Sequence, residues 1–264
     1  MVNYIFMDNE KKARFIEKQL LSIKQIYPIF EKINNLDKSL EQLYPIAIIE
    51  DNDFFIFDIN LTGKQYEYKM NFPSKINLPN EVLAAFPLDR YEGKIAAVVT
   101  HKVFDNIEGI VSIFHEFVHC FQFYNYETKI KETLTIAQEA EKKHDYMWEL
   151  NYPFPYNNEE FIRKTMELNN GYDIRKYHTE LKIILNEKEF EYMIWQEWKE
   201  GYARYIENMI REKTGIKRNR KILKPPFDRV CFYEIGSKYI EVLINRKIEL
   251  KNNLEKIFYE IKKC

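Results

Sequence analysis

Residues 113–122 read IFHEFVHCFQ and lie inside a helix that the sequence predicts over 106–124. Apolar residues cover almost every face of this helix, which indicates that it is buried in the protein core. His115 and His119 are four residues apart and share one helical face, so both imidazole rings can point at one ion. Glu116 projects about a hundred degrees away from that face. The spacing therefore favours a metal site with Glu116 beside the metal as a base.

The alternative is a core helix whose two histidines are satisfied by carbonyl or carboxylate groups. Burying two imidazoles and a carboxylate in one turn costs several kcal/mol unless each is paired. A metal ion pairs with such groups together, and HExxH seldom arises by chance with only five histidines in the chain. The motif therefore predicts one zinc ion per chain. Cys120 is expected to be a small buried hydrophobe, since a fourth protein ligand would close the site to water.

Asp105 and Glu108 flank the start of the motif helix like a capping box. Asp105 is expected to accept from the third helical N–H, while Glu108 reaches back to the start of the helix. The motif helix is therefore predicted to begin directly after Asp105.

A catalytic zinc site needs three protein ligands and one open position for water. No third histidine follows His119 closely, but residues 195–207, WQEWKEGYARYIE, form a strongly helical segment rich in glutamate. HExxH followed by the string EGYARY at 200–205 resembles the gluzincin metallopeptidases, which include thermolysin-like and aminopeptidase-like zincins. This resemblance implies that His115, His119 and Glu200 bind zinc.

The sequence also predicts roles for the residues around Glu200. Gly201 and Ala203 are small, which would allow their helix to approach the motif helix closely. Glu197 and Glu207 are candidate acceptors for the imidazole N–H groups, and the alternative is that they are solvated acids of the helix surface.

The resemblance also implies a fold and a mechanism. The fold would be α+β, mainly α, and zincin-like: an N-terminal helix and a small antiparallel or mixed sheet, then a helical lobe, with the active-site cleft between them. Glu116 would be the general base for hydrolysis of an amide bond in a peptide or protein. The string that reads a free substrate amine in aminopeptidase-like members, GxMEN, is missing, so exopeptidase activity is not implied.

The segment FYEIGSKYIEVL, residues 232–243, supplies candidates for the group that stabilises the oxyanion. Tyr233 and Gly236 resemble a Y-x-x-G string of zincins, and core packing is the alternative role for Tyr233. Tyr239 and His178 are further candidates, while His101 and His144 are expected at the surface or at helix caps.

The periodicity predicts helices and strands along the whole chain. Residues 10–43 are predicted to be helical with a break near Pro28, residues 46–72 to form two or three antiparallel strands, and residues 73–93 to be rich in loops. A short strand is predicted at 94–99. Further helices are predicted at 128–149, 158–170, 174–185, 187–213 and 234–262. We expect one catalytic unit over 1–264, with sub-lobes at 1–124 and 125–264.

Composition excludes several classes of protein. With 40 basic and 41 acidic side chains the formal charge is −1, so no overall field attracts nucleic acid or an anionic membrane. RNA binding through KRNRK, residues 217–221, is the remaining nucleic-acid hypothesis. Cys120, Cys231 and Cys264 are expected to be reduced. The sequence shows no signal peptide and no membrane-spanning run, so we expect a cytoplasmic protein; its oligomeric state stays open.

Two more hypotheses remain from the sequence. The aromatic and proline-rich segment WELNYPFPYNN, residues 148–158, is either a wall of a substrate cleft or a rigid connection packed on the core. The whole chain could instead be a non-catalytic helical protein that binds a partner, with a vestigial or structural metal site.

Overall fold

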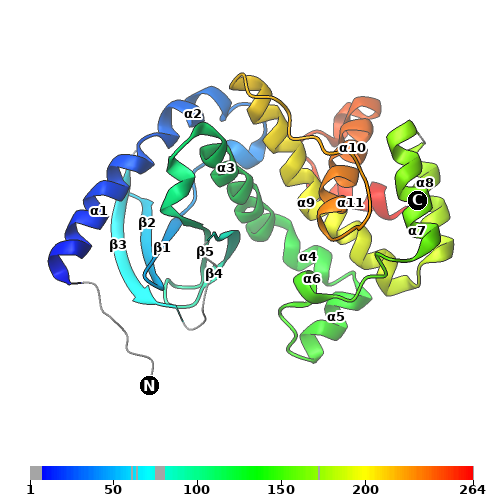
Figure 1. Cartoon of the computed structure of the whole chain (residues 1–264), viewed down its shortest axis with the longest axis horizontal. Helices are drawn as coiled ribbons and strands as arrows, with labels where there is room; N and C mark the ends of the chain where they lie inside the picture. The colour runs from blue at the N-terminus through cyan, green and yellow to red at the C-terminus, as the bar shows by residue number, and fades with distance from the viewer. Residues whose placement is uncertain (1–7, 61, 64, 75–80, 172, 264) are drawn as a thin grey trace. The chain divides into compact units, whose positions relative to one another are not determined.

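The structure is a computed structural model that describes residues 8–60, 62, 63, 65–74, 81–171 and 173–263. It is α+β and mainly helical, with one five-stranded mixed sheet, as predicted (Figure 1). The chain divides into two compact units. Unit 1 contains residues 1–121 and 210–216, and unit 2 contains residues 122–209 and 217–264.

The sheet of unit 1 has the strand order β3-β2-β1-β5-β4. β1 is antiparallel to β2 and parallel to β5, and β2–β3 and β4–β5 are antiparallel pairs. The strands are β1 (Ile46–Glu50), β2 (Asp53–Ile59), β3 (Tyr66–Pro73), β4 (Leu83–Leu88) and β5 (Lys94–Thr100). Three antiparallel strands and the strand at 94–99 are confirmed. The loop prediction for 73–93 is wrong where β4 forms, and Pro87 is tolerated there because β4 is an edge strand.

Both faces of the sheet carry buried apolar side chains. On one face Phe15 of α1 (Asn9–Ile23) meets Phe55 of β2, with ring centroids 4.7 Å apart. The other face carries its own apolar cluster: Ala47, Ile49, Phe54, Ile56, Phe72, Val82, Leu88, Tyr91, Ala96 and Val98. The first predicted helix is divided into α1 and α2 (Ile26–Ile33), and a 3₁₀ turn follows at Lys38–Leu40. The break lies close to Pro28, as predicted: Pro28 is in the first turn of α2, where its missing N–H costs no helical hydrogen bond.

The motif helix is α3 (Ile107–Gln122), which begins three residues after the end of a 3₁₀ turn at His101–Phe104. Its cap is Asn106, whose Oδ1 accepts from Gly109 N at 2.9 Å, so the prediction of Asp105 as cap was one residue early. Glu108 pairs with Arg211 at 3.2 Å rather than closing a capping box. Gly109 allows the helix to pack closely on the preceding turn, since a Cβ there would lie 2.1 Å from the carbonyl oxygen of Val103.

Unit 2 is helical in the part of the chain that the structure describes. A π-helical turn (Phe123–Glu127) follows α3 and leads into the helices of unit 2: α4 (Thr128–Lys131), α5 (Thr135–Lys142), α6 (Trp148–Asn151), α7 (Glu159–Glu167), α8 (Ile174–Ile184), α9 (Glu187–Lys213), α10 (Val230–Arg246) and α11 (Leu254–Lys262). The end of α9, from Ile210, belongs to unit 1. Two 3₁₀ turns lie at Leu168–Asn170 and Ile248–Leu250.

Two of the predicted helices are divided in unit 2. The segment 128–149 contains α4, α5 and the start of α6, and the segment 234–262 contains most of α10 and the whole of α11. His144, with a positive φ of 55°, lies between α5 and α6, and Asn252, with a φ of 63°, lies between α10 and α11.

Candidate metal centre

The two motif histidines lie one turn apart on α3. Their ring centroids are 5.0 Å apart and the ring planes meet at 75°. His115, Glu116 and His119 are all buried. Phe117 packs α3 against the segment that precedes the sheet, since the centroid of its ring lies 5.8 Å from that of Tyr44. Sequence, helix and burial thus agree with the pattern from which the site was predicted.

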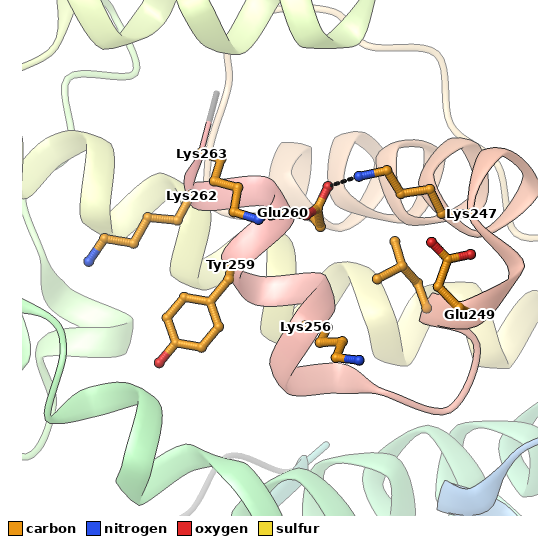
Figure 2. Close-up of a pocket in the computed structure, with 8 residues that line it drawn as sticks. Lys247, Glu249, Lys256, Tyr259, Glu260, Lys262 and Lys263 are labelled. Atoms are coloured by element: carbon orange, nitrogen blue, oxygen red, sulfur yellow. Dashed lines mark hydrogen bonds and ion pairs between the residues drawn. The ribbon is translucent and has the colours of Figure 1, made fainter.

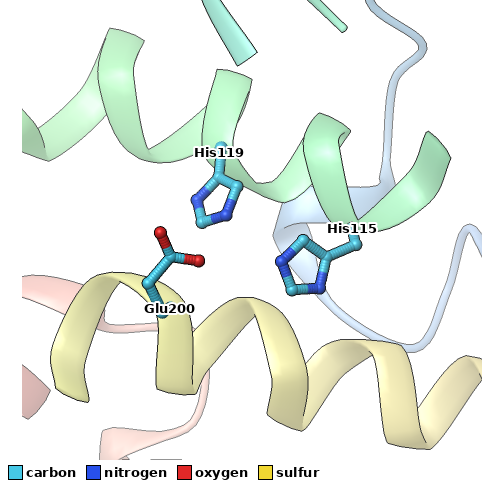
Figure 3. Close-up of side chains that lie close together, drawn as sticks. All are labelled: His115, His119 and Glu200. Atoms are coloured by element: carbon cyan, nitrogen blue, oxygen red, sulfur yellow. The ribbon is translucent and has the colours of Figure 1, made fainter. Parts of the chain in front are cut away.

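Glu200 of α9 joins the two histidines. One ligand atom from each of His115, His119 and Glu200 lies within 4.8 Å of the others, and all three residues are buried (Figure 3). Ligand atoms around a tetrahedral zinc are about 3.4 Å apart, given bonds of about 2.1 Å, so small side-chain rotations would suffice to close the group on an ion. Two imidazole nitrogens and one carboxylate oxygen are also the donor types of a catalytic zinc site. The residues present therefore fit a metal ion.

The Glu200 carboxylate has a cationic partner that the sequence did not suggest. Nη1 of Arg229 lies 3.2 Å from Oε1 of Glu200, and the guanidinium carbon lies 5.7 Å from the ring centroid of Tyr233. Burial alone would lower the pKa of Arg229, but Tyr233 and Glu200 raise it above its ordinary value. Arg229 ends the long loop before α10, and no helical period or motif marks it, which is why sequence reasoning missed it.

The small residue after Glu200 has a different role from the predicted one. A Cβ on Gly201 would lie 2.6 Å from the backbone of Gly236 on α10, and a Cβ on Gly236 would lie 2.2 Å from the carbonyl oxygen of Glu197. Gly201 therefore permits close packing of α9 on α10, and the prediction that it serves an approach to the motif helix was wrong. The same contact accounts for Gly236, the glycine of the Y-x-x-G string.

Glu197, a predicted acceptor for the N–H groups of the motif histidines, is paired elsewhere. Its Oε2 bonds to Nε2 of His178, and both side chains are fully buried. Nδ1 of His178 lies 2.9 Å from the carbonyl oxygen of Ile174, and the ring stacks on Tyr239 with centroids 4.5 Å apart. Both nitrogens of His178 are thus engaged inside unit 2, which removes it, with Glu197, from the predicted roles.

The other candidates have these positions. Glu207 contacts Nε of Arg204 and Nδ2 of Asn219, each at 3.0 Å. Tyr233 is partly buried on α10. His101 is partly exposed beside Glu50, and His144 is exposed, as expected for both.

A compact charge network lies beside Glu200 in sequence. Lys199 contacts Glu127 at 3.1 Å and Glu149 at 2.8 Å, and Lys131 contacts the same two glutamates at 3.2 and 2.7 Å. Burial alone would raise the pKa of Glu149, but the charges and hydrogen bonds of Lys199 and Lys131 outweigh it and lower that pKa to about 2. Nε1 of Trp195 also donates to Glu149 at 3.1 Å. The network ties α4 and α6 to α9.

Three features outside the metal group have structural roles. The segment 148–158 packs on the core, as one of its two hypotheses held: the ring of Phe154 lies 5.1 Å from those of Phe161 and Phe232. In the basic cluster, Arg218 and Arg220 both pair with Glu241. Cys120 and Cys231 are free thiols and buried, while Cys264 lies outside the described residues.

A pocket of about 560 Å³ lies on the last part of the chain, around Tyr259 (Figure 2). Four lysines line it, and two of them, Lys247 and Lys263, pair with Glu260. None of the predicted site residues lines this pocket.

Comparisons of the chain with protein-family models, with curated proteins and with solved structures found no match. The likeness to gluzincins accordingly rests on the residues of this chain. Among the described residues, none of the helices has the length and apolar character needed to cross a membrane.

Proposed function

We propose that the chain is a zinc-dependent hydrolase of gluzincin type, most closely a peptidase. The observation that carries this proposal is the group formed by His115, His119 and Glu200, whose ligand atoms lie within 4.8 Å of one another. Glu200 lies 81 residues after His119 (119 to 200) and opens the string EGYARY, the context in which gluzincins carry their third ligand. The agreement of a sequence motif with a spatial group of the right donors supports a catalytic zinc site.

The residues would divide the work as follows. His115, His119 and Glu200 would hold the ion. A zinc ion would supply Lewis acidity there, which lowers the pKa of a water molecule towards neutrality and polarises a carbonyl group. Glu116 accepts the proton from the attacking water and returns it to the leaving amine. Tyr233 is proposed to donate a hydrogen bond to the oxygen that becomes negative.

Elemental analysis of the purified chain tests the ligand set. We expect close to one zinc per chain, loss of zinc in Glu200→Gln, and full zinc content in the control Glu187→Gln, which changes an exposed glutamate at the start of the same helix. Zinc retained in Glu200→Gln would show that the third ligand is a different residue.

Hydrolysis of a fluorogenic peptide library tests the chemistry. Glu116→Gln preserves the shape of the side chain but removes the base, so we expect about a 100- to 10,000-fold loss of activity with zinc content unchanged. A chain that binds zinc but hydrolyses no peptide before or after this change would favour the alternative, a binding protein with a structural metal.

A further inference from the structure

The contact between Arg229 and Glu200 joins a proposed zinc ligand to a permanently charged group. The guanidinium reaches Oε1 of Glu200 at 3.2 Å, and the side chain of Arg229 is 30% exposed while that of Glu200 is 9% exposed. An arginine stays protonated at every pH at which the protein is folded. The carboxylate therefore meets a fixed cation on one of its two oxygens, which is compatible with coordination of a metal by the other.

We propose that Arg229 is a positioning residue that holds the Glu200 carboxylate in its metal-binding orientation. This inference rests on the proposed function. A glutamate side chain loses rotamer entropy when it is fixed in one orientation. The ion pair fixes Glu200 before the metal arrives, so less of that cost falls on metal binding. Partners of this kind around zinc ligands typically change metal affinity by about 10- to 100-fold when they are removed.

Arg204 provides a matched comparison within the same group of side chains. Its guanidinium carbon lies 5.7 Å from the ring centroid of Tyr233, the same distance as that of Arg229. Its ion pair, however, is with Glu207 at 3.0 Å, and its Nη1 lies 3.4 Å from the carbonyl oxygen of Asn219. The two arginines therefore share one tyrosine but serve different glutamates, and the proposal assigns the metal-related role to Arg229.

The test is the zinc dissociation constant, measured by competition with a chromophoric chelator, in the unchanged chain and in three variants. We expect Arg229→Gln to bind zinc about 10- to 100-fold more weakly and Arg204→Gln to bind it as the unchanged chain does. Arg229→Lys keeps a cation in place and should bind zinc more tightly than Arg229→Gln. Urea unfolding identifies any variant whose weaker binding follows from loss of the fold.

A spectroscopic measurement separates positioning from a general effect on stability. Cobalt(II) in place of zinc reports the arrangement of its ligands through visible absorption. We expect the spectrum of Arg229→Gln to differ from that of the unchanged chain and the spectrum of Arg204→Gln to match it. Equal zinc affinity and equal spectra in Arg229→Gln would overturn the positioning role while the zinc site stands. Failure of the unchanged chain to bind zinc or cobalt would overturn the proposed function and this inference together.

Discussion

The pair formed by His178 and Glu197 buries an imidazole and a carboxylate with no exposure of either side chain. Oε1 of Glu197 has no hydrogen-bond partner, and Oε2 bonds to His178. The bond to His178 therefore compensates for the burial of this carboxylate. Removing one member of a buried pair leaves the other desolvated and uncompensated, which costs more than the pair contributes when intact. The pair therefore acts as a constraint on how α8 packs against α9.

His178→Ala should lower the free energy of unfolding by about 3–5 kcal/mol, because it strands the Glu197 carboxylate. Urea unfolding followed by tryptophan fluorescence measures this, since all three tryptophans lie in unit 2. The double change His178→Leu with Glu197→Leu should recover much of the loss. Arg163→Ala, which breaks exposed pairs with Glu160 and Glu167, serves as the control and should cost less than about 1 kcal/mol. A His178→Ala effect as small as that of the control would contradict the argument.

At the scale of single residues, the sequence predicted which three side chains come together but not what surrounds them. The histidine spacing, the apolar helix around it and the EGxAxY string are local patterns of the sequence. His115, His119 and Glu200 could therefore be identified as candidate ligands from the sequence. Arg229 contacts Glu200 of α9 and His178 contacts Glu197 of α9, and the partners are 29 and 19 residues apart in sequence. No local periodicity predicts contacts at such separations.

Among the elements, α9 shows why some helices are easy to predict. Asn186 and Glu189 form a reciprocal capping box, with N–H to side-chain distances of 3.0 and 2.9 Å. Gly215, with a φ of +76°, follows the end of the helix. Both bounds of α9 were predicted as observed, since each carries its own local signal.

The sheet contains strand pairings that local sequence signals do not predict. The hairpin partners β1, β2 and β3 are adjacent in sequence, whereas β1 pairs in parallel with β5, which lies 48 residues further along (46 to 94). β4 was missed because Pro87 and the neighbouring proline Pro79 read as loop, although an edge strand accepts proline. Pro79 itself lies outside the described residues.

Gly236→Ala should force α10 away from α9. The added Cβ would lie 2.2 Å from the carbonyl oxygen of Glu197, a backbone atom that cannot turn aside. Overpacking of this kind costs about 1–3 kcal/mol, and we expect weaker zinc binding as well, because α9 carries Glu200. Urea unfolding and chelator competition measure the two effects. Ser237→Ala, the next residue of α10, adds no atom and should leave both quantities close to their original values. Unchanged stability in Gly236→Ala would show that the helices can separate freely.

For the molecule as a whole, near-neutral composition leaves local networks to decide how stability depends on pH. The formal charge is −1, so uniform repulsion between like charges is small at neutral pH. Within unit 2, Lys131 and Lys199 pair with Glu127 and Glu149 in a cluster that is balanced in charge, and the two lysines lower the pKa of Glu149 from 4.5 to about 2. A carboxylate with a lowered pKa in the folded state stabilises that state wherever it is ionised.

The loss of stability at acid pH should depend in part on Glu149. Its contribution is fully present above about pH 5, falls as the pH drops from about 4.5 towards 2, and amounts to the order of 3 kcal/mol at neutral pH. Urea midpoints of the unchanged chain and of Glu149→Gln should therefore differ most near pH 6–7 and converge near pH 2. Glu17→Gln is the control, because Glu17 is exposed on α1 and has no ion-pair partner within the described part of the chain. Its small effect should not vary with pH in this way. If the gap between the unchanged chain and Glu149→Gln stays constant from pH 7 to pH 3, the lysines do not hold the Glu149 carboxylate in its ionised form, and the stabilising role of the network is refuted.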